Sequence, residues 1–264
     1  MTSAEFAFLC VPEVGGMLTV IVPEEDFQPF DVALLEAPDL IVVVAFRILP
    51  RVVFSIPRFG SINLHASLLP RYRGAAPINR AIMNGEVETG VTTFFLDDKV
   101  DTGNILLQAR VPIRSDEDAG QVHDKLAEVG AEIVLHTVRL IEQGKAFPRP
   151  QDPSLASPAP KILKEDCHVA WNKPANVVRN QIRGLSPYPA AFTLHNGKVL
   201  KIYRGVVGPG KLEVGVVNVG EDSLQVGTTE GVISLEELQQ EGRKRMSVTE
   251  FLRGYRIATG DRFS

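Results

Sequence analysis

Cysteine is scarce in this chain, with only Cys10 and Cys167 among 264 residues. Two thiols so far apart in sequence supply neither a disulfide framework nor a thiolate metal cluster. None of the five histidines has the spacing of a zinc motif either. We therefore expect two reduced, buried cysteines and no bound metal.

Long hydrophobic runs are also missing. The apolar stretches at 6–10 and 40–46 are too short to cross a bilayer. The N-terminus has no basic start followed by an apolar segment and a small-residue cleavage site. These absences predict a cytoplasmic protein that has no membrane partner.

Several nucleotide and hydrolase motifs are absent as well. The sequence contains no GxGxxG, no GxxxxGK[ST] and no GxSxG. Nicotinamide, P-loop nucleotide and triad-hydrolase sites therefore have little support. Since hydrophobic residues make up 44% and charged residues 23% of the chain, the composition is that of an ordinary globular protein.

The net charge of −4 is unevenly distributed. Residues 1–160 carry 13 basic and 21 acidic side chains, whereas residues 161–264 carry 15 basic and 11 acidic ones, a balance of +4. Only the second half is suited to a polyanionic partner. Chance scatter of surface charge explains this difference equally well, because +4 is far from the balance of a dedicated nucleic-acid module.

A proline-rich segment at residues 147–160 divides the chain and is typical of a linker. Before it, short apolar runs predict buried strands, and longer segments have helical periodicity. The predicted strands are 19–22, 40–46, 62–65 and 91–97, and the predicted helices are 24–37, 80–86 and 116–143. This alternation predicts an α/β domain with a doubly wound parallel sheet.

After this segment the pattern changes to short apolar runs separated by Gly, Asn and Asp. The runs lie at 199–207, 212–219, 223–229 and 231–238. Such spacing is typical of a small β-barrel or sandwich. A closing helix is expected at 248–255, after Ser247, a residue type that caps helix N-termini.

Asn63 and His65 stand two residues apart on a predicted strand, so their side chains share one face. The loop at 66–77 follows them, and ligands bind beyond the carboxyl ends of strands in such sheets. A lone histidine here would more often be a structural one. Because an amide precedes His65 and a loop follows it, a functional histidine and a structural histidine are about equally supported here.

Asp101 lies in an acidic loop at 97–103 that follows the strand 91–97. Such a loop could bring Asp101 to the same crevice. The alternative is a solvated turn, in which Asp and Gly are the commonest residues, and this alternative fits Asp97 and Asp98 well.

An amide, an imidazole and a carboxylate suit acyl transfer that has no covalent enzyme intermediate. Asn63 and a protonated His65 can stabilise a developing oxyanion by hydrogen bonding. A nearby carboxylate favours the protonated imidazole and helps to relay the proton that an attacking amine loses.

The segments 61–82 and 88–106 resemble the folate-dependent formyltransferases, in particular those members that act on methionyl-tRNA. The segments 182–193 and 242–263 resemble the C-terminal domain of the same enzymes, an open barrel related to the OB fold. From about residue 17 to the end the match is nearly continuous.

This resemblance implies a Rossmann-like catalytic domain at 1–146, a linker at 147–160 and an OB-like tRNA-binding domain at 161–264. It implies transfer of formyl from 10-formyltetrahydrofolate to the amine of initiator methionyl-tRNA, for translation initiation. It assigns catalysis to Asn63, His65 and Asp101. We expect a monomer that needs no metal.

The resemblance also implies a folate site. Gly103 would let the Asp101 loop turn beside the pterin. The other expected folate-binding residues are Phe46, Arg47, Ile48, Leu49, Ser67, Leu68, Leu69 and Pro70.

One departure from the family lies before the strand at 19–22. The family has a first strand, a basic loop, a helix and a second strand there, whereas only 16 or so residues precede that strand here. We therefore expect a β-α-β unit to be missing, and with it the basic loop that grips tRNA.

Two alternatives stay open. A formyltransferase acting on an amino-sugar nucleotide would have the same Asn, His and Asp placement, and a catalytically impaired folate or RNA binder would suit the shortened start.

Overall fold

The structure, a computed structural model, describes residues 18–19, 38–44 and 49–264. The chain forms two compact units. The first comprises Met1–Gly74, Gly90–Val111 and Leu126–Pro158, and the second comprises Ala75–Thr89, Pro112–Lys125 and Ala159–Ser264. Within the described ranges, none of the helices combines the length and the apolar character that a bilayer crossing requires.

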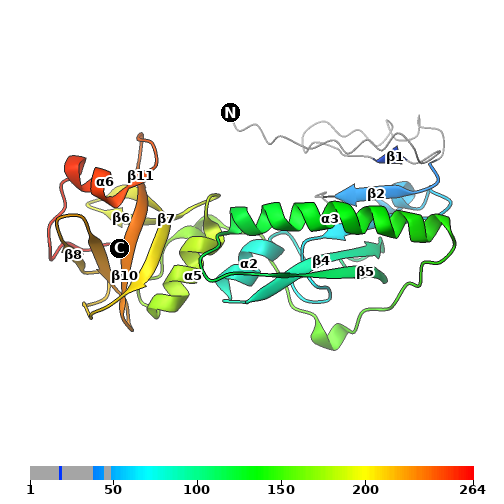
Figure 1. The fold of residues 1–264 in the computed structure, drawn as a ribbon, viewed down its shortest axis with the longest axis horizontal. Helices are drawn as coiled ribbons and strands as arrows, with labels where there is room; N and C mark the ends of the chain where they lie inside the picture. Colours follow the sequence, from blue (N-terminus) through cyan, green and yellow to red (C-terminus); the bar gives the residue numbers. More distant parts are fainter. Residues whose placement is uncertain (1–17, 20–37, 45–48) are drawn as a thin grey trace. The chain divides into compact units, whose positions relative to one another are not determined.

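A five-stranded sheet forms the centre of the first unit (Figure 1). Its strands, in spatial order, are β1 (Leu18–Thr19), β2 (Ile41–Val44), β3 (Ser61–His65), β4 (Glu88–Phe95) and β5 (Ile105–Pro112). β1, β2 and β3 run parallel, and β4 runs antiparallel to β3. The predicted α/β class is confirmed, but the sheet is mixed. The connection from β3 to β4 returns the chain beside β3 in the opposite direction instead of crossing over the sheet.

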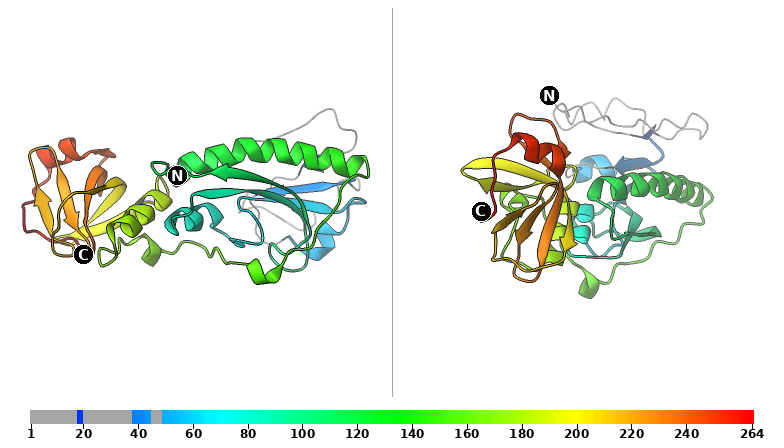
Figure 2. Two further views of the ribbon diagram at one scale, coloured as in Figure 1. Left: turned by 60° about the horizontal axis from the view of Figure 1, so that its bottom comes forward. Right: turned by 60° about the vertical axis from the view of Figure 1, so that its left-hand side comes forward.

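The long helix predicted at 116–143 is α3 (Ala119–Glu142), which lies along one face of this sheet (Figures 1 and 2). Val138 and Ile141 of α3 belong to the same buried cluster as Ile62 of β3 and Leu106 of β5. This apolar packing commits one face of β3 to the core. The residues of β3 that alternate with Ile62 therefore point to the other face.

The predicted strands 40–46, 62–65 and 91–97 are confirmed as β2, β3 and β4, with starts shifted by up to three residues; residues 45–46 lie outside the described residues. β5 and the short helix α1 (Arg51–Phe54) were not predicted from the sequence. β5 mixes buried and exposed residues, as an edge strand does, so it lacks a continuous apolar run. The predicted helix 24–37 and residues 20–22 lie outside the described residues.

The second unit contains a curled antiparallel sheet (Figure 2, yellow to red). Its strands are β6 (Ala191–His195), β7 (Lys198–Gly208), β8 (Val217–Val219), β9 (Leu224–Gly227), β10 (Val232–Gln240) and β11 (Met246–Ser247). They follow the order β6-β7-β10-β9-β8, and β11 pairs with β10. This arrangement agrees with the predicted OB-like β domain. The domain boundaries 1–146, 147–160 and 161–264 stay a prediction.

Helices complete the second unit. They are α2 (Pro77–Met83), α4 (Lys164–Cys167), α5 (Ala175–Leu185) and α6 (Val248–Gly254). α5 was not predicted, although Val178, Ile182 and Leu185 recur at helical spacing and belong to the core of this unit. The predicted cap of α6 is confirmed, because the Ser247 hydroxyl accepts a hydrogen bond from the Glu250 N–H at 3.3 Å.

Candidate active site

Asn63 and His65 share the face of β3 that α3 does not cover. Val43 of β2 and Phe94 of β4 are the backbone partners of Asn63, so the amide lies in the middle of the sheet. His65 ends the strand and is only 7% exposed. The alternation of strand residues thus brings both side chains to one edge of the site.

The two nitrogens of the His65 ring have different surroundings. Nε2 lies 2.8 Å from the backbone carbonyl of Tyr72, and because a carbonyl only accepts, Nε2 donates. Nδ1 lies 3.7 Å from Asp101 Oδ2, which is too far for a hydrogen bond. A proton on Nδ1 would therefore face a carboxylate, and this ring nitrogen is the one available for chemistry.

Asp101 lies in the loop between β4 and β5, with its carboxylate turned toward His65. Its Oδ2 accepts a hydrogen bond from the Gly74 N–H at 2.8 Å. Its backbone is in the left-handed region, with φ 55°. The structure therefore brings His65 of β3 close to Asp101 of the following loop, and it places Asn63 on the same face of β3 as His65.

Gly103 is required by close packing. A Cβ at this position would collide with the carbonyl oxygen of Phe95, so the loop can pass β4 only if residue 103 is glycine. The sequence predicts a glycine here for its conformational freedom at a turn. Gly103 is not among the residues with positive φ, so the reason is steric.

The expected folate-binding residues are only partly described. Phe46, Arg47 and Ile48 lie outside the described residues, and Leu49 is half-buried. Ser67 is buried and donates a hydrogen bond to the Arg71 carbonyl at 2.6 Å.

The remaining members of that set belong to the loop after β3. Leu69 is buried and packs with Phe94 and Ile105. Leu68 and Pro70 are half-buried. This loop can therefore offer a ligand its backbone and parts of two side chains, while its other side chains hold the loop in place.

Thr92 of β4 and Gln108 of β5, which were not predicted as site residues, hold that loop by hydrogen bonds. The Thr92 hydroxyl donates to the Ser67 carbonyl at 2.6 Å and accepts from the Leu69 N–H at 3.1 Å. Gln108 Nε2 donates to the Leu69 carbonyl at 2.9 Å and to the Thr92 hydroxyl at 3.0 Å. A threonine inside an apolar strand was the only sequence signal for this network.

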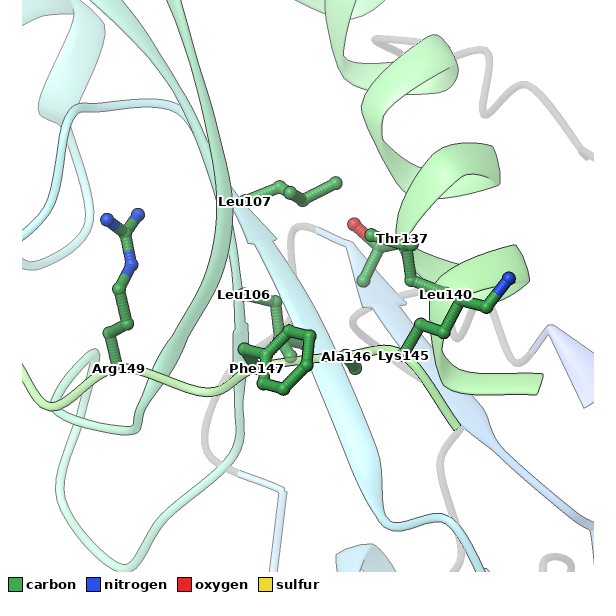
Figure 3. Close-up of a pocket in the computed structure, with 8 residues that line it drawn as sticks. All are labelled: Leu106, Leu107, Thr137, Leu140, Lys145, Ala146, Phe147 and Arg149. Carbon is green, nitrogen blue, oxygen red and sulfur yellow. The ribbon is translucent and has the colours of Figure 1, made fainter. Parts of the chain in front are cut away.

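A separate pocket of about 250 Å³ lies between β5 and the end of α3 (Figure 3). It is lined by Leu106, Leu107, Thr137, Leu140, Lys145, Ala146, Phe147 and Arg149. None of the predicted site residues lines it. Among the residues that the structure describes, no group of three or more His, Cys, Asp or Glu side chains is placed to hold a metal.

The chain matches a known family in both halves. Residues 26–138 match the family described as formyl transferase, and residues 161–256 match the formyl transferase C-terminal domain. A relative from Geobacter sulfurreducens is 49% identical over 228 residues, which cover 86% of this chain and 72% of that protein. The chain therefore belongs to the formyl transferase family.

That Geobacter relative is named methionyl-tRNA formyltransferase. A protein of the same name from Chlorobium limicola is 51% identical over 232 residues, with 85% of this chain and 73% of that protein covered. The fold is similar to that of HypX from Aquifex aeolicus, solved in complex with tetrahydrofolic acid. The TM-score is 0.67 at 21% identity, over 89% of this chain and 44% of HypX.

Proposed function

We propose that this protein transfers a formyl group from 10-formyltetrahydrofolate to the amino group of initiator methionyl-tRNA, as a monomer in the cytoplasm, for translation initiation. Methionyl-tRNA as the acceptor is supported by the names of two relatives, which are 49% and 51% identical to this chain. The observation that carries the chemistry is the approach of His65 and Asp101, at 3.7 Å, beside Asn63 on one strand face.

The described residues fit a formyl donor at this point. The Asn63 carboxamide is half-buried, and within the described part of the chain it has no hydrogen-bond partner. Its N–H groups can therefore donate hydrogen bonds to a formyl oxygen. The bound folate supplies the formyl group, and Leu49 with the loop 67–70 are the described residues that we expect to hold it.

Each residue of the trio has a role that follows from its surroundings. Asn63 and the Nδ1–H of protonated His65 donate hydrogen bonds to the formyl oxygen as negative charge grows on it. Asp101 stabilises the positive ring of His65 and assists removal of the proton from the attacking amine.

The exchange balances without a covalent enzyme intermediate. The acceptor nitrogen gains the formyl group and loses one proton. The folate nitrogen that releases the formyl group gains one proton in return.

The direct test offers methionyl-tRNA and a 4-amino sugar nucleotide in parallel, with 10-formyltetrahydrofolate as donor. We expect formyl transfer to the tRNA. Formylation of the sugar nucleotide alone would show that the proposed acceptor is wrong. Transfer to neither compound would contradict the proposed activity and favour the catalytically impaired binder.

A further inference from the structure

Gln151 lies in the proline-rich segment after α3 and contacts both loops of the candidate site. Its Nε2 donates hydrogen bonds to the backbone carbonyls of Asp101 at 2.9 Å and Gly103 at 2.8 Å. Its Oε1 accepts from the Arg73 guanidinium, at 2.6 Å from Nη2 and 3.2 Å from Nε. Gln151 therefore ties the loop after β3 to the loop after β4.

The orientation of the Gln151 amide is determined by its partners. Backbone carbonyls only accept hydrogen bonds, and a guanidinium group only donates them. Exchanging Nε2 and Oε1 would oppose acceptor to acceptor and donor to donor at four contacts. A glutamine is the one ordinary side chain that offers two donors and an acceptor in this geometry at this length.

Asp101 needs support from outside its own loop. A non-glycine residue adopts a left-handed backbone only where its surroundings hold it, and the φ of Asp101 is 55°. The Gly74 N–H holds the carboxylate. Gln151 holds the carbonyl of the same residue, and through Arg73 it also holds the chain next to Gly74. Two groups from outside its loop thus hold Asp101: the Gly74 N–H at the carboxylate and the Gln151 amide at the carbonyl.

The segment around Gln151 is itself anchored on the first unit. Arg149 and Ile105 exchange two backbone hydrogen bonds of 2.8 Å. On the other side, the Arg73 N–H donates to the Ser157 carbonyl at 2.9 Å. Because backbone contacts hold the segment before and after it, Gln151 has a rigid base from which to position a loop.

We propose that Gln151 is a positioning residue for formyl transfer: it sets the place of the Asp101 carboxylate relative to His65. This inference rests on the proposed role of Asp101. Gln151 itself touches no reacting atom. A displacement of about 1 Å in a catalytic group can cost on the order of 100-fold in rate, and this gives the expected scale.

The test replaces Gln151 by methionine, which keeps the length of the side chain and removes both donors and the acceptor. We expect kcat to fall roughly 10- to 100-fold with KM for methionyl-tRNA and for the folate within about threefold. The matched control is Leu155→Ala, because Leu155 lies in the same segment and is 62% exposed. We expect that variant to keep wild-type kcat.

A double-mutant cycle separates positioning from a general structural effect. If Gln151 acts through Asp101, Gln151→Met should cost less than about threefold in an Asp101→Asn background. Single-turnover measurements with excess enzyme make the low rates accessible. If Gln151→Met melts below the assay temperature, Gln151→Glu takes its place, since it keeps the contact with Arg73 and loses the two donors.

The outcomes distinguish the two proposals. If Asp101→Asn keeps wild-type turnover, the proposed role of Asp101 fails. If Asp101→Asn is impaired while the folded Gln151 variant keeps wild-type kcat, or if the two losses multiply in the double variant, only the positioning role of Gln151 is overturned.

Discussion

Two buried histidines of this chain face aspartates, one in each unit, and their surroundings differ. His65 is 7% exposed, and its Nδ1 stands 3.7 Å from Asp101. His195 of β6 is 1% exposed; its Nδ1 lies 2.9 Å from the Tyr255 hydroxyl and its Nε2 lies 3.2 Å from Asp261. Both ring nitrogens of His195 are therefore engaged by side chains.

This difference separates a structural pair from a candidate catalytic pair. The hydrogen bonds of His195 join β6 to the segment near the C-terminus, and no ring nitrogen is left for a ligand. His65 uses one nitrogen to fix its ring and keeps the other beyond hydrogen-bond distance of Asp101. Proximity of His and Asp is thus a weak sign of catalysis, whereas an incompletely engaged imidazole is a stronger one.

The largest effect is expected at His65. The variant His65→Ala should lower the turnover of formyl transfer by about 10³-fold or more, because it removes an oxyanion donor and the proton relay together. Steady-state rates measure the loss, and near-UV circular dichroism checks that the variant is folded. His136→Ala, an exposed site on α3, is the control and should be unchanged. Wild-type turnover of His65→Ala would refute the assignment.

Asp101→Ala should have a somewhat smaller effect, about 10²- to 10³-fold on kcat, because Asp101 acts through His65. Asp98→Ala is the matched control in the same loop, since Asp98 pairs with Arg51 at an exposed position. Exposed pairs of this kind contribute little. Equal losses in the two variants would show that the acidic loop acts as a whole.

His195→Ala should change stability and leave catalysis nearly intact. Loss of two partly buried hydrogen bonds and of packing should lower the free energy of unfolding by about 1–3 kcal/mol, measured by urea denaturation. Turnover at saturating substrates should stay within about twofold of wild type. The exposed His123 supplies the control variant His123→Ala. A large loss of kcat with unchanged stability would reverse the comparison drawn between the two histidines.

The smallest effect is expected at Asp261, in the way that stability depends on pH under acidic conditions. The Ala258 N–H, followed by the side chain of His195, lowers the pKa of Asp261 below its usual range. A carboxyl whose pKa is lower in the folded state stabilises the fold above its unfolded pKa of about 3.9, and this stabilisation is lost as pH falls through the folded value. Asp261→Asn should therefore flatten the dependence of Tm on pH below about 4. An unchanged slope would mean that Asp261 does not contribute.

Local sequence patterns were enough to predict much of the candidate site. Strand alternation sufficed to put Asn63 and His65 on one face, and a run of acidic residues and glycine marked the loop of Asp101. These inferences use neighbours in sequence, for which backbone geometry alone fixes the directions of side chains.

The missed features depend on contacts between distant residues. The carbonyl that reaches His65 belongs to Tyr72, which has a left-handed backbone with φ 59°. Gln151 meets Asp101 across 50 positions of sequence. A single glutamine among prolines has no periodic or compositional signal, so tertiary packing decided its place.

The attachment of the segment 147–158 has a practical meaning for dissecting the chain. A fragment that stops where α3 ends would lose Gln151 and the Arg149 bridge, and the Asp101 loop would lack two of its backbone anchors. A cut or exchange that separates residues 159–264 from the rest of the chain should therefore lie after Pro158, so that the whole segment stays with the Asp101 loop.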